Sequence, residues 1–392
     1  LTIVDDLIDE AQETVILTLG VPVNASLGAN GVHAVRVNDN DAAPVVQFDL
    51  ASSSVLEGAG AHAMSISLDV VSGLDVTVPF TVNGTAVDPA DYGIDVSPVV
   101  IAAGAQSVLV NLTLVDDLLD ELDETVVLGL GLPSNATLGL LTSHTTTITD
   151  NDAAPVVQFD LASSSVLEGA GAHAMTINLD AVSGLDVTVP FTVNGTAVDP
   201  ADYGIDVSPV VIAAGSQSVL VNLTLVDDLL DELDETVVLG LGLPSNATLG
   251  LLTSHTTTIT DNDAAPVVQF DLASSSVLEG AGAHAMTINL DAVSGLDVTV
   301  PFTVNGTAVD PADYGIDVSP VVITAGTQSM LVNLTLIDDL LDELDETVVL
   351  GLGLPTNATL GLLTSHTTTI TANEDAPVVQ FDLASSAVLE GA

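Results

Sequence analysis

A loop crowded with carboxylates recurs along this chain, and it is the feature that could do chemistry. In its first complete copy the segment VDDLLDELDET holds six acids within nine residues, namely Asp116, Asp117, Asp120, Glu121, Asp123 and Glu124. A solvated acidic helix face would carry interspersed Lys or Arg, and the segment has none. Calcium takes roughly six to eight oxygen ligands, which flexible loops rich in Asp and Glu supply. The loop therefore predicts a site for a hard cation such as Ca2+.

Ligands for such a site must come from several loops. The D-x-[DN]-x-[DN]-G pattern of an EF-hand loop is missing from the acidic segment. Other acids recur with the same spacing, and they include Glu57 in VLEG, Asp91 in DPADYG and the tripeptide Asp150-Asn151-Asp152. We expect the fold to bring these segments to one end of a domain.

The overall charge also favours metal cations as partners. The chain has 54 Asp and Glu against one cationic side chain, Arg36, and its formal net charge is -53. Nucleic acid and anionic lipid surfaces are expected to be poor partners, because binding them requires Lys or Arg to neutralise phosphate. Halophilic adaptation would spread acids over the surface. Here many of the acids are concentrated in the acidic loop and in the tripeptide Asp150-Asn151-Asp152, which forms the joint to the next repeat.

Composition indicates a folded chain without an active site. Hydrophobic residues make up 47% of the sequence and the mean hydropathy is +0.57, which is enough to build a core. Cysteine is absent, and no nucleophile and base recur together, so we predict no enzymatic activity. The most apolar run, 126–132, is far shorter than a spanning helix, and we expect no membrane insertion in this segment.

The chain is organised as a tandem repeat. The VLEG glutamates recur every 111 residues, at Glu57, Glu168, Glu279 and Glu390. A period of this length suits an independent domain with its own core better than a solenoid unit. The predicted domains are 1–41 (the C-terminal part of a repeat), three complete repeats at 42–152, 153–263 and 264–375, and 376–392 (the first strand of a further repeat).

The hydrophobic pattern within a repeat is that of strands. Met64, Ile66 and Leu68 alternate with polar residues, and similar alternation occurs over 76–82 and 108–114. About seven strands fit in each repeat, which indicates an all-β fold with two-layer antiparallel sandwiches strung into an extended rod. Pro79 places its strand at an edge or a bulge, since proline cannot donate to a ladder.

Four motifs in a fixed order resemble the Calx-beta domain family. They are V-x-E-G, G-T-A-x-x-x-x-D-Y, D-D-x-x-x-E-x-x-E and I-x-D-N-D, and all four occur in each complete repeat except for an altered last motif in the third. The resemblance covers essentially the whole chain. It implies an immunoglobulin-like antiparallel sandwich that binds calcium. Eight carboxylates in one loop cluster exceed what one calcium ion can neutralise, so we expect several ions per domain.

Carried over from the family, the calcium ligands fall at equivalent positions of each repeat. In the first complete repeat they are Glu57, Asp91, Asp116, Asp117, Glu121, Glu124, Asp150, Asn151 and Asp152. In the second they are Glu168, Asp202, Asp227, Asp228, Glu232, Glu235, Asp261, Asn262 and Asp263. In the third they are Glu279, Asp313, Asp338, Asp339, Glu343 and Glu346, joined by Glu374 and Asp375 because TANEDAP replaces TDNDAAP there. The leading fragment supplies Asp5, Asp6, Glu10, Glu13, Asp39, Asn40 and Asp41.

Other polar residues are expected to have ordinary roles. Seven acids of the first repeat lie outside the carried-over set and are interpreted as solvated, namely Asp49, Asp69, Asp75, Asp88, Asp95, Asp120 and Asp123. The histidines, two in each complete repeat, are interpreted as packing or surface residues, because they lie on strands without Cys or clustered His.

These features predict a calcium-binding structural repeat of a secreted or cell-surface protein. Near-identical domains would give a stalk, adhesin shaft or extracellular filament its reach, calcium would stiffen it, and exposed sheet edges would let chains associate into fibres or bundles. The alternative function is a calcium sensor or buffer that regulates a partner. Such a sensor gains little from uniform repetition.

Overall fold

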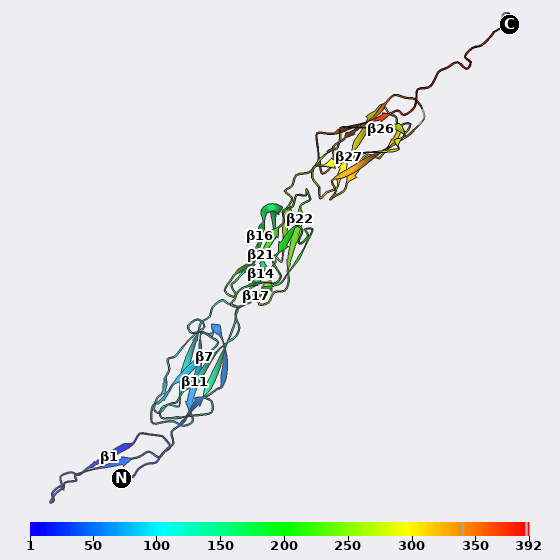
Figure 1. Cartoon of the computed structure of the whole chain (residues 1–392). Helices are drawn as coiled ribbons and strands as arrows, with labels where there is room; N and C mark the ends of the chain where they lie inside the picture. Colours follow the sequence, from blue (N-terminus) through cyan, green and yellow to red (C-terminus); the bar gives the residue numbers. More distant parts are fainter. Residues whose placement is uncertain (339–340, 389–390, 392) are drawn as a thin grey trace.

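Three folded domains, here called beads, follow one another along the chain, with a hairpin before them and an extended segment after them (Figure 1). The structure is a computed structural model, and it describes residues 1–338, 341–388 and 391. Each bead corresponds to one complete repeat, and the chain passes from one bead to the next through a short connection. The extended arrangement agrees with the predicted rod.

The first complete repeat consists of short strands and one 3-10 turn. Its elements are β3 (Val45–Phe48), β4 (Ser52–Leu56), η1 (Glu57–Ala59), β5 (Ala61–Leu68), β6 (Val76–Val78), β7 (Phe80–Gly84), β8 (Tyr92–Ile94), β9 (Val99–Ile101), β10 (Ser107–Leu114), β11 (Glu124–Leu130), β12 (Thr137–Leu138) and β13 (Ser143–Thr149).

The same elements return 111 residues later in each of the next repeats. The second has β14 (Val156–Phe159), β15 (Ser163–Leu167), η2 (Glu168–Ala170), β16 (Ala172–Leu179), β17 (Val187–Val189), β18 (Phe191–Gly195), β19 (Tyr203–Ile205), β20 (Val210–Ile212), β21 (Ser218–Leu225), β22 (Glu235–Leu241), β23 (Thr248–Leu249) and β24 (Ser254–Thr260). The third has β25 (Val267–Phe270), β26 (Ser274–Leu278), η3 (Glu279–Ala281), β27 (Ala283–Leu290), β28 (Val298–Val300), β29 (Phe302–Gly306), β30 (Tyr314–Ile316), β31 (Val321–Ile323), β32 (Ser329–Leu336), β33 (Glu346–Leu352), β34 (Thr359–Leu360) and β35 (Ser365–Thr371).

Two sheets form each sandwich, which confirms the predicted fold class. In the first repeat one sheet has the order β12-β3-β5-β10-β8 and the other β4-β13-β11-β7, while β6 and β9 make a separate two-stranded ribbon. The strands are shorter and more numerous than the predicted seven, in part because Pro79 separates β6 from β7, which lies at a sheet edge.

The sheets also contain parallel pairs that the pattern did not indicate. The chain leaves β3 in one sheet and continues as β4 in the other, where β4 pairs with β13 in parallel. A short parallel pairing of β12 with β3 adds to the first sheet. The first strand is thus divided between the two layers.

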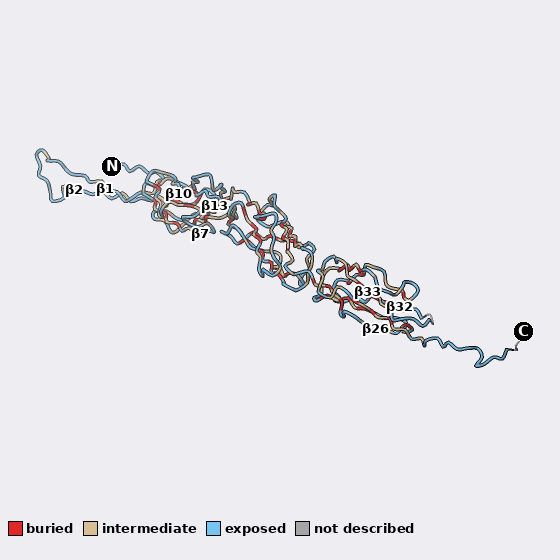
Figure 2. Tube along the Cα trace, turned by 90° about the horizontal axis from the view of Figure 1, so that it is seen from above, coloured by how far each residue is buried: buried red, intermediate tan, exposed pale blue. Residues whose placement is uncertain are grey.

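Alternating residues of the strands fill the core between the sheets. Met64, Ile66 and Leu68 of β5 are almost completely buried, as their spacing predicted, and Phe48 is completely buried. Figure 2 shows this buried interior running through each of the three complete repeats, whereas the two ends of the chain are exposed.

The ends of the chain form less structure. Residues 1–41 contain the hairpin of β1 (Glu13–Thr18) and β2 (Val32–Val37), whose side chains are largely exposed. Within 376–388 there is no strand. In each complete repeat the equivalent first segment pairs with later strands of the same repeat. The domain boundaries themselves remain predictions.

One glycine per repeat is fixed by close approach of the backbone. Gly195, at the end of β18, has a φ of +134°, and a Cβ there would lie 2.0 Å from the carbonyl oxygen of Thr236. We expect Gly195→Ala to lower the free energy of unfolding by about 3 kcal/mol in a urea titration. Gly204→Ala is the matched control, because nothing lies within 4 Å of its Cβ position, and it should change stability by less than about 0.5 kcal/mol. Equal effects of the two substitutions would contradict the close approach.

In the part of the chain that the structure describes, no helix has the length and apolar character needed to cross a membrane.

Candidate metal centre

The acidic loop joins β10 to β11 at the end of the sandwich where the chain leaves for the next repeat, here called the exit end. The strand β10 ends at Leu114 and β11 begins at Glu124, so the carboxylates fall in the intervening turn. Three other segments reach the same end, since β4 leads into η1, β8 begins at Tyr92 beside Asp91, and β13 ends just before Asp150. The fold therefore gathers the four sequence motifs at one place.

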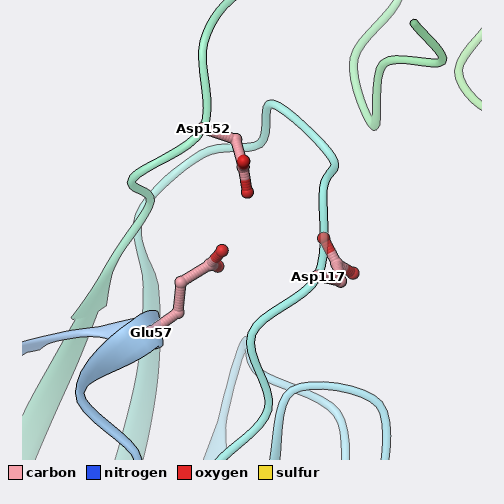
Figure 3. Close-up of side chains that lie close together, drawn as sticks. All are labelled: Glu57, Asp117 and Asp152. Carbon is pink, nitrogen blue, oxygen red and sulfur yellow. The ribbon is translucent and has the colours of Figure 1, made fainter.

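A first group of carboxylates joins three of these segments. Glu57 of η1, Asp117 of the acidic loop and Asp152 after β13 each place one oxygen within 4.8 Å of the other two. Figure 3 shows Glu57 and Asp152 pointing toward each other, with Asp117 on the neighbouring loop. The second repeat repeats the group with Glu168, Asp228 and Asp263.

A second group lies beside the first. Asp91, Glu121 and Glu124 line one pocket together with Glu57, Asp117 and Asp150. In the third repeat the equivalent side chains, Asp313, Glu343 and Glu346, place oxygens within 4.8 Å of one another. The first two complete repeats thus bring most of their predicted ligands into a single pocket, and the third brings four of its eight, namely Glu279, Asp313, Glu343 and Glu346.

Two predicted residues connect the acidic loop to the joint. Asn151 donates its side-chain N–H to Asp116 Oδ1 at 3.1 Å and to Glu57 Oε1 at 3.3 Å. In the second complete repeat, the side-chain N–H of Asn262 donates to Asp227 Oδ1 at 3.2 Å. The asparagine thereby holds the joint against the acidic cluster through hydrogen bonds to its carboxylates.

Crowding and burial make ionisation of these acids costly. Burial, a hydrogen bond with Asp152 and the negative charge of neighbouring aspartates together raise the pKa of Glu57 to about 7. Burial, a hydrogen bond with Asp91 and the negative charge of Asp91 and Glu121 together raise the pKa of Glu124 to about 7. The equivalent glutamates Glu168, Glu235 and Glu346 have pKa values of about 7 for the same reasons.

The donor set fits a hard cation. Among the described residues, five buried carboxylate oxygens have no hydrogen-bond partner, namely Asp150 Oδ1, Asp152 Oδ2, Glu168 Oε1, Asp231 Oδ2 and Asp263 Oδ2. An ionised oxygen that is buried without a donor is destabilising unless a cation balances it. The cluster offers carboxylate oxygens without Cys or His ligands, which suits calcium and not zinc or copper.

The third repeat departs from the other two at its joint. Ala372 occupies the position of Asp150, and it lines the pocket with Glu279, Asp313 and Glu346. Glu374 interacts with the neighbouring Asn373. Asp375 is exposed, and Asp339 lies outside the described residues. The third pocket is therefore built chiefly from the second carboxylate group.

The leading fragment keeps an acidic pocket without a complete sandwich. The predicted ligands of this fragment line one pocket between the first residues and the segment after β2, namely Asp5, Asp6, Glu10, Glu13, Asp39, Asn40 and Asp41. Two loops and the hairpin are thus sufficient to bring these side chains together.

Several aspartates interpreted as solvated have structural partners. Asp123 Oδ1 accepts the backbone N–H of Asp150 at 3.2 Å, which ties the acidic loop to the joint. Asp69 accepts from the N–H of Val45, Asp75 from Ala103 and Asp95 from Asn111. These contacts join segments far apart in sequence, so spacing alone gave no signal for them.

The histidines form a partly buried hydrogen-bonding cluster. Ser53 Oγ lies 2.8 Å from Nε2 of both His62 and His144, and Nδ1 of His144 lies 2.7 Å from the carbonyl oxygen of Leu50. Because Nδ1 of His144 faces a carbonyl, it donates, and Nε2 accepts from Ser53. Burial lowers the pKa of His62, and the nearby His144 lowers it further. The cluster agrees with a packing role.

Comparison with known proteins gives one family. The model of the Calx-beta domain family matches residues 39–153, 150–265 and 261–376. No curated protein matches the chain.

Solved structures that resemble the chain include tandem domains. CBD12 from CALX1.2 is 16% identical, covers 55% of this chain and 99% of its own, and has a TM-score of 0.27. The calcium binding domain CBD12 of CALX1.1 is 17% identical over 54% of this chain and 98% of its own, with a TM-score of 0.28. The apo-form Calx CBD1 domain is 18% identical over 28% of this chain and all of its own, with a TM-score of 0.27.

Proposed function

Because the chain belongs to the Calx-beta domain family, we propose that it is a calcium-binding structural protein whose repeats form a rod that calcium stiffens. The observation that carries the proposal is the position of the carboxylate cluster. The cluster lies at the exit end of each complete repeat, and in the first it includes the joint residue Asp152. Only three residues separate Asp152 from β14, the first strand of the next repeat.

Calcium at this position would act on the joint as well as on the domain. Glu57 belongs to the body of the sandwich, Asp117 to the acidic loop and Asp152 to the connection. An ion held by all three restrains the connection relative to both. Without the ion, ionised carboxylates about 4.8 Å apart repel by roughly 3.5 kcal/mol per pair at an effective dielectric of 20.

Uniform repetition supports a structural role over a sensor. The first two complete repeats differ at only a few conservative positions, such as Ser65 against Thr176 and Val70 against Ala181. A stalk gains length from each identical unit, and a shaft or filament outside the cell meets calcium at the concentrations that extracellular modules bind. A secreted or cell-surface location is therefore part of the proposal.

Self-association into fibres or bundles belongs to the same proposal. The strands β4 and β7 lie at the edges of the four-stranded sheet, and each has one unpaired side. Edge strands of this kind can pair with a second chain. Light scattering in calcium at increasing protein concentration tests self-association. A molecular mass that stays that of a monomer would count against it.

Calorimetric titration of the full chain with calcium tests the central claim. We expect more than one ion per complete repeat, and small-angle scattering should show a longer, stiffer particle with calcium than with chelator. Absence of calcium binding at millimolar concentration would refute the proposal. Binding without any change in the scattering profile would leave a buffer or sensor and remove the stiffened rod.

A further inference from the structure

A Ser–Gly dipeptide of each complete repeat contacts the acidic loop of the unit before it. In the second repeat the dipeptide lies between β16 and β17, at the end opposite the exit end. The backbone N–H of Gly184 donates to the carbonyl oxygen of Asp120 at 3.1 Å, and the hydroxyl of Ser183 lies 3.4 Å from the same oxygen. This contact crosses from one repeat to the next.

The contact is present at all three joints. Gly295 donates to the carbonyl oxygen of Asp231 at 3.2 Å, and Gly73 donates to that of Asp9 at 3.0 Å. Each serine of the dipeptide is almost completely buried. The recurrence of this contact with the 111-residue period indicates that it is a regular part of the joint and not a feature of one loop.

A glutamate side chain of the acidic loop packs directly over the glycine. A Cβ on Gly184 would lie 2.5 Å from both Cγ and Oε1 of Glu121, and one on Gly295 would meet Glu232 at the same distances. Real side chains do not approach so closely, so a Cβ at either glycine would force the glutamate side chain to shift. Glu121 and Glu232 belong to the second carboxylate group, so the dipeptide contacts the metal centre itself.

The chain contains its own comparison for the effect of a following repeat. All three complete repeats have the same sequence LLDELDET in this loop. Asp120 and Glu121, which the second repeat covers, are partly buried, and so are Asp231 and Glu232 in the next copy. The equivalent Asp342 and Glu343 of the third repeat, which no Ser–Gly dipeptide covers within this chain, are exposed.

We propose that the Ser–Gly dipeptide is a docking element that completes the metal centre of the preceding repeat, so that a repeat followed by another binds calcium more tightly than one that is not. The inference rests on the proposed function. Its physical basis is preorganisation: a loop already held by the neighbour loses less conformational freedom when the ion binds. Calcium binding and joint formation then favour each other, as linkage requires.

The full chain with Gly184→Val and Gly295→Val tests this coupling. We expect calcium affinity of the first two complete repeats to fall about tenfold, which corresponds to 1.4 kcal/mol. The third repeat should be unaffected. Gly28→Val is the matched control, since its Cβ position is open and distant from the joints, and it should leave the isotherm unchanged. Circular dichroism in chelator should show all variants folded.

A milder pair, Gly184→Ala and Gly295→Ala, keeps the test decisive if the valine variant does not fold. A smaller loss of affinity, about threefold, is expected because the Glu121 and Glu232 side chains can shift. Isotherms of the folded glycine variants that superimpose on that of the unmodified chain would overturn the inference while the proposed function stands. Failure of the unmodified chain to bind calcium would instead remove the proposed function.

Discussion

Removal of calcium with a chelator is expected to lower the melting temperature of the complete repeats by at least about 10 °C. An ion at a hundred times its dissociation constant stabilises the folded state by about 2.7 kcal/mol. For a domain of this size each 1 kcal/mol corresponds to roughly 4 °C. Two carboxylate groups in a repeat, each holding an ion, would double the effect.

Two comparisons serve as controls for this result: magnesium in place of calcium, and substitution of an acid inside the cluster against one outside it. Magnesium should restore less of the lost stability, because it requires a strict octahedral shell and loses its water reluctantly. Glu57→Gln should weaken the calcium effect in its own repeat, since Glu57 joins Asp117 and Asp152. Asp49→Asn removes the same charge outside the cluster and should leave the effect intact. Melting curves that coincide with and without chelator would contradict calcium stabilisation.

Much of this architecture could be predicted from local pattern. Alternation of apolar residues such as Met64, Ile66 and Leu68 identified strands and their buried faces, and all three proved buried. The division of the first segment between β3 and β4 could not be predicted, because the local pattern does not show which sheet each part joins. Which sheet they join depends on pairing with β13, about 90 residues further along the chain.

The site was predictable in composition and less so in arrangement. The acidic loop and its partners Glu57, Asp91 and Asp152 do converge at one end. Their division into two groups depends on side-chain directions that spacing does not give. The sequence pattern did not single out the dipeptide Ser183–Gly184, although its strict recurrence every 111 residues was a usable signal.

The histidine cluster shows the same limit. Ser53 and His144 are 91 positions apart, and their 2.8 Å contact exists only because β4 and β13 lie side by side. Sequence reasoning could say that an isolated histidine on a strand is a packing residue. It could not identify the serine that both imidazoles share.

The calcium-free chain is expected to be more stable at pH 5.5 than at pH 8, the reverse of an ordinary acid-sensitive protein. Burial, hydrogen bonds to neighbouring carboxyls and nearby negative charge raise the pKa of Glu57 and Glu124 from 4.5 to about 7, so the folded state binds protons that the unfolded state has released. That stabilisation is complete below pH 4.5 and is lost as the pH rises through 7. Since the carboxyls are partly solvated and screened, we expect at least about 1 kcal/mol per repeat, or about 4 °C.

The histidines oppose this trend but should not reverse it. Burial lowers the pKa of His62, so its contribution is present at high pH and is lost as the pH falls below 6.5. In the first complete repeat one such group acts against four acids with raised pKa values, Glu57, Asp120, Glu121 and Glu124. In calcium the dependence of stability on pH has the opposite sign, because protons compete with the ion for the same oxygens. Melting temperatures measured from pH 5.5 to 8 should therefore rise with pH in calcium and fall with pH in chelator. Parallel profiles would mean that the clustered carboxylates are not the ion's ligands.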